Sequence, residues 1–288
     1  MDFFLTALLQ GLCFSSIAMG IYISMKIFNI PDITTDGSYT LGGAVTALLL
    51  QKHVPVGLIL PASAIAGGLA GAITGIIHTK LRINALLAGI LVMTALYSVN
   101  LTIMGRSNIP LLEYDQLFNT LILFVDINSN TLIILLLFVA ILLILIAFIL
   151  RTDFGLAMRA TGNSETMIRA LGVNTDRMKI TGLAIANGLT AVSGFLITQL
   201  QGFADINMGI GIVIVGLGSV IIAETFINWL NSTRVLVHLG FVLLGAVFFQ
   251  LVLALTLSLG VDATLLKLVI SVFVLLIVSL PRLSFKRS

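Results

Sequence analysis

The chain carries very few charged residues for its length. Of its 288 residues, 9% are charged and 59% are hydrophobic, whereas soluble domains carry about 25% charged residues. So few charges cannot cover a water-exposed surface, which excludes a single soluble globular core. The composition predicts a polytopic membrane protein with one transmembrane domain over residues 1–288.

Other absences exclude several activities. The only cysteine, Cys13, cannot form an internal disulfide and lies in an apolar run, where we expect a buried small residue. The histidines His53, His78 and His238 are dispersed and give no metal-ligand spacing. The chain has no G-x-x-x-x-G-K-[ST] motif, so it does not bind ATP through a P-loop. We therefore predict no metal, no catalytic residues and no cofactor in this chain, and the net charge of +3 indicates cytoplasmic loops and not nucleic-acid binding.

Long apolar runs predict an all-α transmembrane bundle, because about 20 apolar helical residues cross the hydrocarbon core. Tyr39–Leu50 is a shorter run that can be a ninth, partial crossing, and Leu117–Val125 looks interfacial or re-entrant. The eight clear runs are Phe3–Met25, Val56–Ile77, Asn84–Met104, Thr131–Leu150, Ile180–Leu200, Met208–Ile227, Val235–Leu259 and Ala263–Leu280.

The distribution of basic residues predicts the orientation. Nine crossings place the termini on opposite sides, and a cytoplasmic C-terminus leaves three basic residues outside: Lys52, Arg106 and Lys267. The inner side then holds twelve: Lys26, Lys80, Arg82, Arg151, Arg159, Arg169, Arg177, Lys179, Arg234, Arg282, Lys286 and Arg287. The positive-inside rule therefore favours N-out and C-in.

Small residues recur every four positions in two of the runs. Each set lines one helix face and predicts close approach of another helix backbone. The sets are Gly67, Gly71 and Gly75, and Gly182, Ala186, Thr190 and Gly194.

The polar stretch Phe28–Ser38 interrupts the apolar pattern. Irregular backbone at membrane depth is tolerated only inside protein or beside a water-filled cavity. If the stretch enters the membrane, Thr35, Asp36 and Ser38 line a translocation pathway. If it lies at the cytoplasmic surface, Asp36 is a helix cap or a loop acid.

Amides inside the apolar runs are further candidates for the pathway. Asn84, Asn100 and Asn187 lie in or at the ends of predicted spans. Such amides either bond neighbouring helices or contact the solute.

A charged loop, residues 151–179, separates two long runs. Asn163 is placed to cap a short helix over Ser164–Leu171, with Glu165 in its first turn and Arg169 in its last. Gly172 supplies a left-handed stop. The helix either lies on lipid or docks onto a cytoplasmic protein, and its mixed charge favours docking. The predicted contact set is Asn163, Ser164, Glu165, Met167, Ile168, Arg169, Leu171 and Gly172.

The charged loop resembles the cytoplasmic coupling segment of ABC importer permeases of the branched-chain amino acid and ribose type. The likeness runs from Arg151 through Val173 and continues in Asn174-Thr175-Asp176-Arg177. Gly188–Gly194 and Gly216–Ser219 are similar to that family as well. The stretch Ile30–Ser38 departs from the branched-chain pattern and looks more like a subgroup linked to aromatic amino acid or uncharacterised solute uptake.

The resemblance implies partners that the chain itself does not contain. It implies two ATP-binding subunits that hold ATP and Mg, a second permease copy in a homodimer or heterodimer, and an extracytoplasmic solute-binding protein in a bacterial inner membrane. The expected function is translocation of a small solute, most simply an amino acid. The alternative is a secondary transporter driven by an ion gradient. Such transporters usually have ionisable groups near the bilayer midplane, and the eight clear apolar runs of this chain contain almost none.

Overall fold

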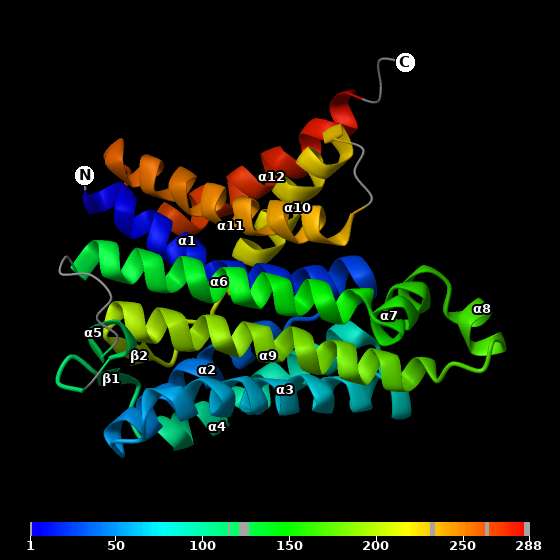
Figure 1. Cartoon of the computed structure of the whole chain (residues 1–288), viewed down its shortest axis with the longest axis horizontal. Helices are drawn as coiled ribbons and strands as arrows, with labels where there is room; N and C mark the ends of the chain where they lie inside the picture. The colour runs from blue at the N-terminus through cyan, green and yellow to red at the C-terminus, as the bar shows by residue number, and fades with distance from the viewer. Residues whose placement is uncertain (1, 115, 121–126, 231–233, 263–264, 285–288) are drawn as a thin grey trace.

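The computed structural model describes residues 2–114, 116–120, 127–230, 234–262 and 265–284. Most of them are helical, and the long helices run roughly side by side in one bundle (Figure 1). The helices are α1 (Asp2–Ile21), η1 (Tyr22–Ile27, a π-helix), α2 (Thr34–Gln51), α3 (Val56–Lys80), α4 (Ala85–Met104), α5 (Leu117–Thr120), α6 (Ile127–Arg151), α7 (Asp153–Asn163), α8 (Glu165–Ala170), α9 (Thr175–Gln201), α10 (Ile212–Leu230), α11 (Val235–Ser258) and α12 (Leu266–Ser284).

Six helical segments in the described part of the chain are long and apolar enough to cross a membrane. They are Phe3–Ile27, Val56–Lys80, Ala85–Met104, Asn128–Arg151, Thr175–Gln201 and Val235–Ser258, and Ile212–Asn228 is a shorter apolar helix. The predicted short span is helical and starts earlier than expected, at Thr34. The predicted re-entrant piece contains α5, and its remaining residues lie outside the described ranges.

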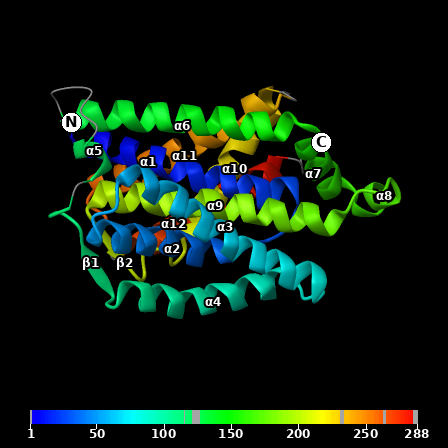
Figure 2. The same ribbon diagram turned by 60° about the horizontal axis from the view of Figure 1, so that its bottom comes forward.

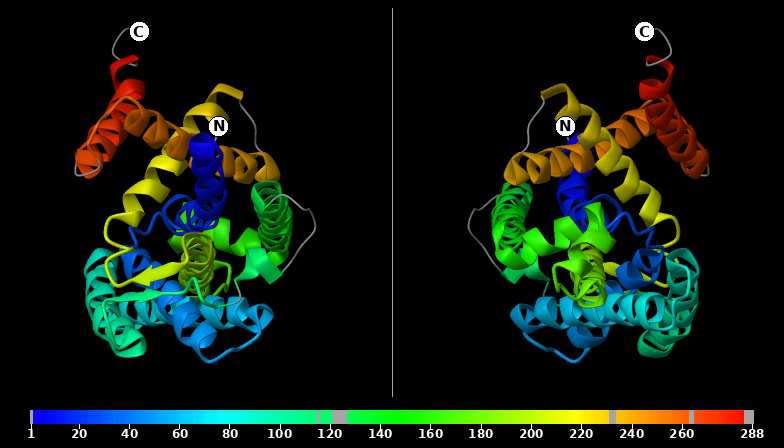
Figure 3. Two further views of the ribbon diagram at one scale, coloured as in Figure 1. Left: turned by 90° about the vertical axis from the view of Figure 1, so that its left-hand side faces the viewer. Right: turned by 90° about the vertical axis from the view of Figure 1, so that its right-hand side faces the viewer.

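Helix α9 forms the centre of the bundle and packs against α1, α2 and α3 (Figure 3). The predicted small-residue faces make this packing possible. A Cβ at Gly71 would meet the Leu183 carbonyl oxygen, and a Cβ at Gly194 would meet the Tyr39 carbonyl oxygen. The prediction that these glycines admit a neighbouring backbone is confirmed, because any side chain there would occupy space that the facing helix already fills.

The two ends of the bundle differ in structure. At one end α5 lies beside a two-stranded antiparallel sheet of β1 (Asn108–Pro110) and β2 (Phe203–Asp205), in which Ile109 pairs with Ala204 (Figure 2). At the other end α7 and α8 project beyond the long helices (Figure 1). Helix α1 begins at the sheet end, whereas α12 ends toward the end that carries α7 (Figure 2).

Candidate functional site

The polar break between η1 and α2 is buried inside the bundle. Asn187, from the middle of α9, donates from Nδ2 to Asp32 Oδ2 at 2.6 Å and to the Leu183 carbonyl at 3.0 Å. Its Oδ1 accepts from Ser38 Oγ at 2.7 Å. Asp32 and Ser38 are at most 1% exposed. The central helix is therefore joined to the start of α2 by a hydrogen-bonded polar network within apolar surroundings.

Asp32 organises this break, although the sequence patterns did not nominate it. Its Oδ1 accepts from the Thr34 N–H at 2.9 Å, and its carbonyl accepts from Thr35 Oγ1 at 3.2 Å. An Asx turn of this kind starts a helix because the side chain satisfies an N–H that the helix leaves unpaired. The sequence signal was present in the order Pro31-Asp32-Ile33-Thr34-Thr35, in which an aspartate precedes the helix start.

Asp36 lies within the first turn of α2 and is also buried. Its two carboxylate oxygens accept from the backbone N–H groups of Gly211 and Val213, each at 2.9 Å. A carboxylate at the start of α10 is stabilised by the unpaired N–H groups there. The sequence left Asp36 as either a pathway residue or a helix cap or loop acid. The geometry is that of a helix cap, but the capped helix is α10, and Asp36 lies inside the bundle and not at the surface.

The other two amides play different parts. Asn100 on α4 is 1% exposed and donates from Nδ2 to the Gly37 carbonyl at 3.2 Å, next to Asp36. Asn84 instead caps α4, because its Oδ1 accepts from the Leu86 N–H at 2.9 Å. The structure thus brings together Thr35, Asp36, Ser38, Asn100 and Asn187, and leaves Asn84 at a helix end.

The charged loop contains two helices where the sequence predicted one. Asn163 was expected to cap the short helix, but it is the last residue of α7. Ser164 has extended backbone between the helices, and its side chain makes no capping hydrogen bond. The prediction of an eight-residue helix capped by Asn163 is therefore wrong. The reason lies at Thr152, whose Oγ1 accepts from the Gly155 N–H and starts a helix well before the predicted position.

The end of α8 follows the prediction. Gly172 has φ +86°, and its N–H donates to the Arg169 carbonyl at 3.1 Å. Glycine adopts this left-handed conformation without the steric penalty that a Cβ would cause. The chain then turns into α9, where Asn174 Oδ1 accepts from the Arg177 N–H at 3.0 Å.

The charges of α8 face the bundle. Glu165 pairs with Arg169 at 2.8 Å and with Lys179 at 2.5 Å. Arg169 also reaches Asp176 at 3.4 Å, and Asp176 pairs with Lys80 at 3.1 Å. We call these five residues the ion-pair cluster. It fastens the short helix α8 to the first turns of α9 and to the last residue of α3.

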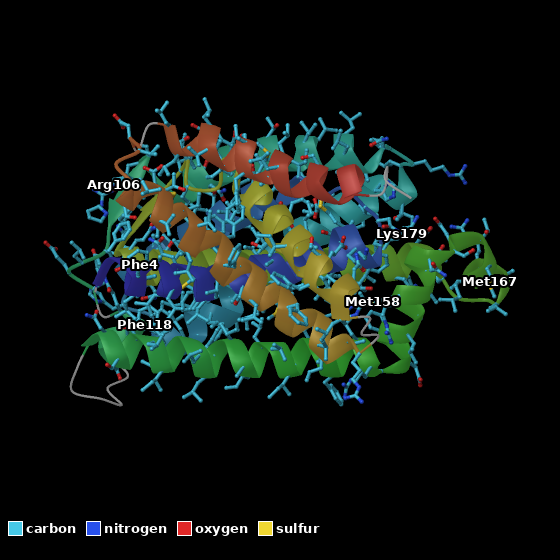
Figure 4. The ribbon with its side chains drawn as sticks, turned by 90° about the horizontal axis from the view of Figure 1, so that it is seen from above. Phe4, Arg106, Phe118, Met158, Met167 and Lys179 are labelled. Carbon is cyan, nitrogen blue, oxygen red and sulfur yellow. The ribbon has the colours of Figure 1, made fainter. Side chains whose placement is uncertain are left out.

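The ion-pair cluster also lines a wide polar hollow of about 560 Å³. The last turn of α3 and the α3–α4 turn complete the wall through His78, Arg82 and Asn84. On the other side of α8 the apolar side chains of Met167 and Leu171 are 64% and 70% exposed. Figure 4 shows Met167 beyond the bundle and Lys179 closer to it. The short helix therefore has a charged side held by the protein and an apolar side without a partner in the described chain.

The pKa of Glu165 is lowered from its ordinary value of 4.5, first because Lys179 donates a hydrogen bond to its carboxylate. The charges of Lys179 and Arg169 add to the effect, and partial burial opposes it. A lowered folded-state pKa means that the interaction contributes stability above the unfolded-state pKa, and that this contribution is lost as the pH falls through the folded-state pKa. The cluster should therefore be intact at neutral pH and open under acid.

We expect a spin label at Leu171→Cys to become more mobile as the pH falls below the ordinary glutamate range, at about 4. Cys13 is fully buried and does not compete for the label. In a Glu165→Gln background the label should be mobile already at neutral pH. A label at Leu112→Cys, at the sheet end, serves as the control. Equal pH dependence at both positions would contradict the assignment.

The fold defines a multi-pass membrane protein with a buried polar break, and comparison with known proteins identifies its family. The sequence model described as branched-chain amino acid transport system / permease component matches residues 3–279. A protein of Clostridioides difficile named tyrosine transport system permease protein is 37% identical over 271 residues, which cover 94% of this chain and 88% of that protein. An uncharacterized protein of Rickettsia prowazekii is 38% identical over 94% of this chain and 95% of its own length.

More distant relatives agree. The ribose import permease protein of Haemophilus influenzae is 24% identical over 73% of this chain and 64% of that protein. A solved structure described as an inward-facing metal-chelate type ABC transporter covers 96% of this chain and 83% of its own, with a TM-score of 0.51 and 13% identity, and shares the fold. The chain belongs to the branched-chain amino acid type permease family of ABC transporters. It is a transport subunit and is not itself catalytic.

Proposed function

We propose that this protein is the membrane-spanning subunit of an ATP-driven importer of a small solute, an amino acid, in a bacterial inner membrane. The observation that carries the proposal is the continuous connection from α8 to the centre of the bundle. The ion-pair cluster fastens α8 to α9, and α9 carries Asn187 in the buried network with Asp32 and Ser38. A force applied to α8 thus reaches polar groups in the middle of the bundle.

Two ATP-binding subunits, one for each permease copy, dock on the exposed apolar side of α8 around Met167 and Leu171. They supply ATP and Mg. A short stiff helix that is fixed at its base transmits rigid-body motion. Closure of the ATP-binding subunits would move α8 and α9 together and change how Asn187 meets α2. A second permease copy, identical or related, completes the pathway, and an extracytoplasmic binding protein delivers the solute.

The distribution of charge supports an inner location for the α8 end. Basic residues are enriched in cytoplasmic loops. In the structure Arg151 ends α6 and Arg159 belongs to α7, while Lys80 and Arg82 lie beside α8. Arg106 lies at the sheet end (Figure 4). We therefore place α8 in the cytoplasm and the sheet outside, with N-out, C-in topology and nine membrane segments, of which α2 is the short one.

An amino acid is the solute that the buried groups support best. The network around Asp32, Ser38 and Asn187 offers hydrogen-bonding groups without a basic side chain. The relative named for tyrosine transport is similar over nearly the whole chain. Tyrosine is therefore the first solute to test.

Leu171→Glu should abolish co-purification of the ATP-binding subunits and the ATP-dependent uptake of tyrosine by the reconstituted complex. A carboxylate in an apolar contact is left desolvated and unpaired, which costs several kcal/mol. The matched control is Leu112→Glu, because Leu112 is similarly exposed and lies at the sheet end. Assembly that survives Leu171→Glu would contradict docking at α8. Uptake by the purified chain alone, driven by an ion gradient, would support the secondary-transporter alternative.

A further inference from the structure

A small hollow lies where α2, α4 and the segment before α10 meet. Its volume is about 40 Å³. On this measure a cavity needs about 10–15 Å³ to hold one water molecule, so the hollow has room for a small polar group. It is lined by Asp36, Thr40, Tyr97, Asn100, Gly209 and Ile210, among others.

Asn100 is the informative residue in the lining of this hollow, because its side-chain oxygen has no partner. Asn100 is 1% exposed, and its Oδ1 is buried without a hydrogen-bond partner. Its Nδ2 donates to the Gly37 carbonyl. This bond fixes the orientation of the amide, because the flipped amide would place oxygen against oxygen. The structure therefore presents a free acceptor, and buried polar groups nearly always have a partner.

The remaining lining is rich in acceptors as well. Each carboxylate oxygen of Asp36 accepts one N–H from the start of α10, and an ionised carboxylate can accept about four hydrogen bonds in all. Tyr97 lines the hollow and is 49% exposed, and its ring face can attract a cation. No basic side chain belongs to the described lining. A negative charge, a free amide oxygen and an aromatic ring together favour a small cation that donates hydrogen bonds.

We propose that this hollow receives the ammonium group of an amine-bearing solute, with Asp36 and Asn100 as hydrogen-bond acceptors and Tyr97 at the entrance. The proposal rests on the proposed function and specifies the chemical class of the solute. An ammonium group is close in size to the available space. The rest of the solute lies outside the hollow, along the exposed side of α4.

Charged thiol reagents test the selectivity of the hollow without knowledge of the solute. Ile210 lines the hollow and is 54% exposed, and Cys13 is buried, so Ile210→Cys gives one reactive site in the assembled complex. The measured quantity is the ratio of the reaction rates of cationic 2-aminoethyl methanethiosulfonate and anionic 2-sulfonatoethyl methanethiosulfonate. We expect this ratio to be higher for the introduced thiol than for a free thiol in solution. Asn100→Ala should reduce this preference about tenfold, as for the loss of one hydrogen bond to a charged group.

Three variants distinguish recognition from a general structural effect. Ser98→Ala changes a neighbouring exposed position of α4 outside the lining and should leave the preference unchanged. Tyr97→Leu should reduce the preference, whereas Tyr97→Phe, which keeps the ring, should retain it. An unchanged preference in Asn100→Ala and Tyr97→Leu would overturn the proposal. Failure of both reagents to reach the thiol introduced by Ile210→Cys would overturn it too, because lipid or protein would then cover the entrance.

Protection by solutes connects the hollow to transport. Tyrosine and tyramine should each slow the cationic modification of the Ile210→Cys thiol, whereas 3-(4-hydroxyphenyl)propionate, which lacks the ammonium group, should not. Equal protection by all three would overturn the proposal. If the reagent preference depends on Asn100 but ATP drives no uptake of tyrosine, the proposed solute is wrong and the ammonium site stands.

Discussion

Gly71→Ala is expected to lower the unfolding temperature of the detergent-solubilised protein, whereas Gly68→Ala on the same helix is not. A Cβ at Gly71 would overlap the Leu183 carbonyl oxygen and lie 2.7 Å from Cβ of Asn187. At Gly68 the nearest atom is the Ala184 carbonyl oxygen at 3.5 Å, an ordinary contact. Both changes gain about 1 kcal/mol of helix propensity, but overpacking at Gly71 costs about 1–3 kcal/mol and separates α3 from α9.

The single cysteine provides the measurement. Cys13 is fully buried on α1, so it reacts with a thiol dye only when the bundle opens. The midpoint temperature of dye labelling should fall by about 2–6 °C in Gly71→Ala, whereas in Gly68→Ala it should stay the same or rise. Superimposable curves would mean that α3 and α9 do not pack this closely.

Gly71→Ala should also affect transport, because the added Cβ would lie 2.8 Å from Nδ2 of Asn187. That nitrogen donates to Asp32. The close packing of α3 on α9 and the buried polar network therefore share one residue. Uptake per folded complex should fall in Gly71→Ala and remain unchanged in Gly68→Ala.

The double variant Glu165→Lys with Arg169→Glu should separate ATP hydrolysis from transport. It keeps the net charge and the pair within α8, because lysine and glutamate still face each other four residues apart. It places a lysine at position 165 against Lys179 and a glutamate at position 169 against Asp176, where ion pairs join α8 to α9. Attraction between the two helices becomes repulsion, while α8 itself stays helical.

Ion pairs at a protein surface contribute only about 0–1 kcal/mol each. Of the side chains involved here only Lys179 is strongly shielded from solvent, at 16% exposed, so the protein should still insert and assemble. Reversing two such contacts weakens the attachment of α8 to α9 by a free energy on the order of 1.4 kcal/mol, which changes the equilibrium constant of that attachment about tenfold. We expect transported solute per ATP hydrolysed to fall about tenfold in reconstituted complexes. Arg177→Glu changes an exposed charge in the first turn of α9 and is the control. Normal coupling in the double variant would contradict a lever held by the ion-pair cluster.

The charged loop separates what local chemistry decides from what packing decides. The stop at Gly172 and the charged ends Glu165 and Arg169 were predicted correctly, because caps and glycine stops act over one turn of helix. The predicted start was wrong, because Asn163 and Thr152 are both acceptable cap residues and local chemistry does not choose between them. In the structure Thr152 caps α7, and Gly162 of α7 lies against the Ile27 carbonyl, a contact between distant segments that the local pattern does not indicate.

The buried polar residues show a different limit. The sequence nominated Asp36 and Ser38 because a polar stretch interrupts the apolar pattern, and Asn100 and Asn187 because they are amides inside apolar runs. It indicated no pairs among them. Asn187 reaches Asp32 across 155 positions of the chain, and no local spacing predicts such a contact. Asp32 was overlooked because an aspartate after proline in a short polar stretch is typical of an ordinary turn.

The sequence by itself determined the class of the protein and most of its long helices, because the thickness of the hydrocarbon core and the shortage of charge leave few ways to bury an apolar chain. It also marked the charged loop as a separate short helical element. Only the tertiary structure decided that the acids of that loop hold α8 to α9, that Asp36 caps α10, and that Asn100, which lines a small hollow, has a side-chain oxygen without a partner. These roles depend on which helices are neighbours, and neighbours are set by packing over the whole bundle.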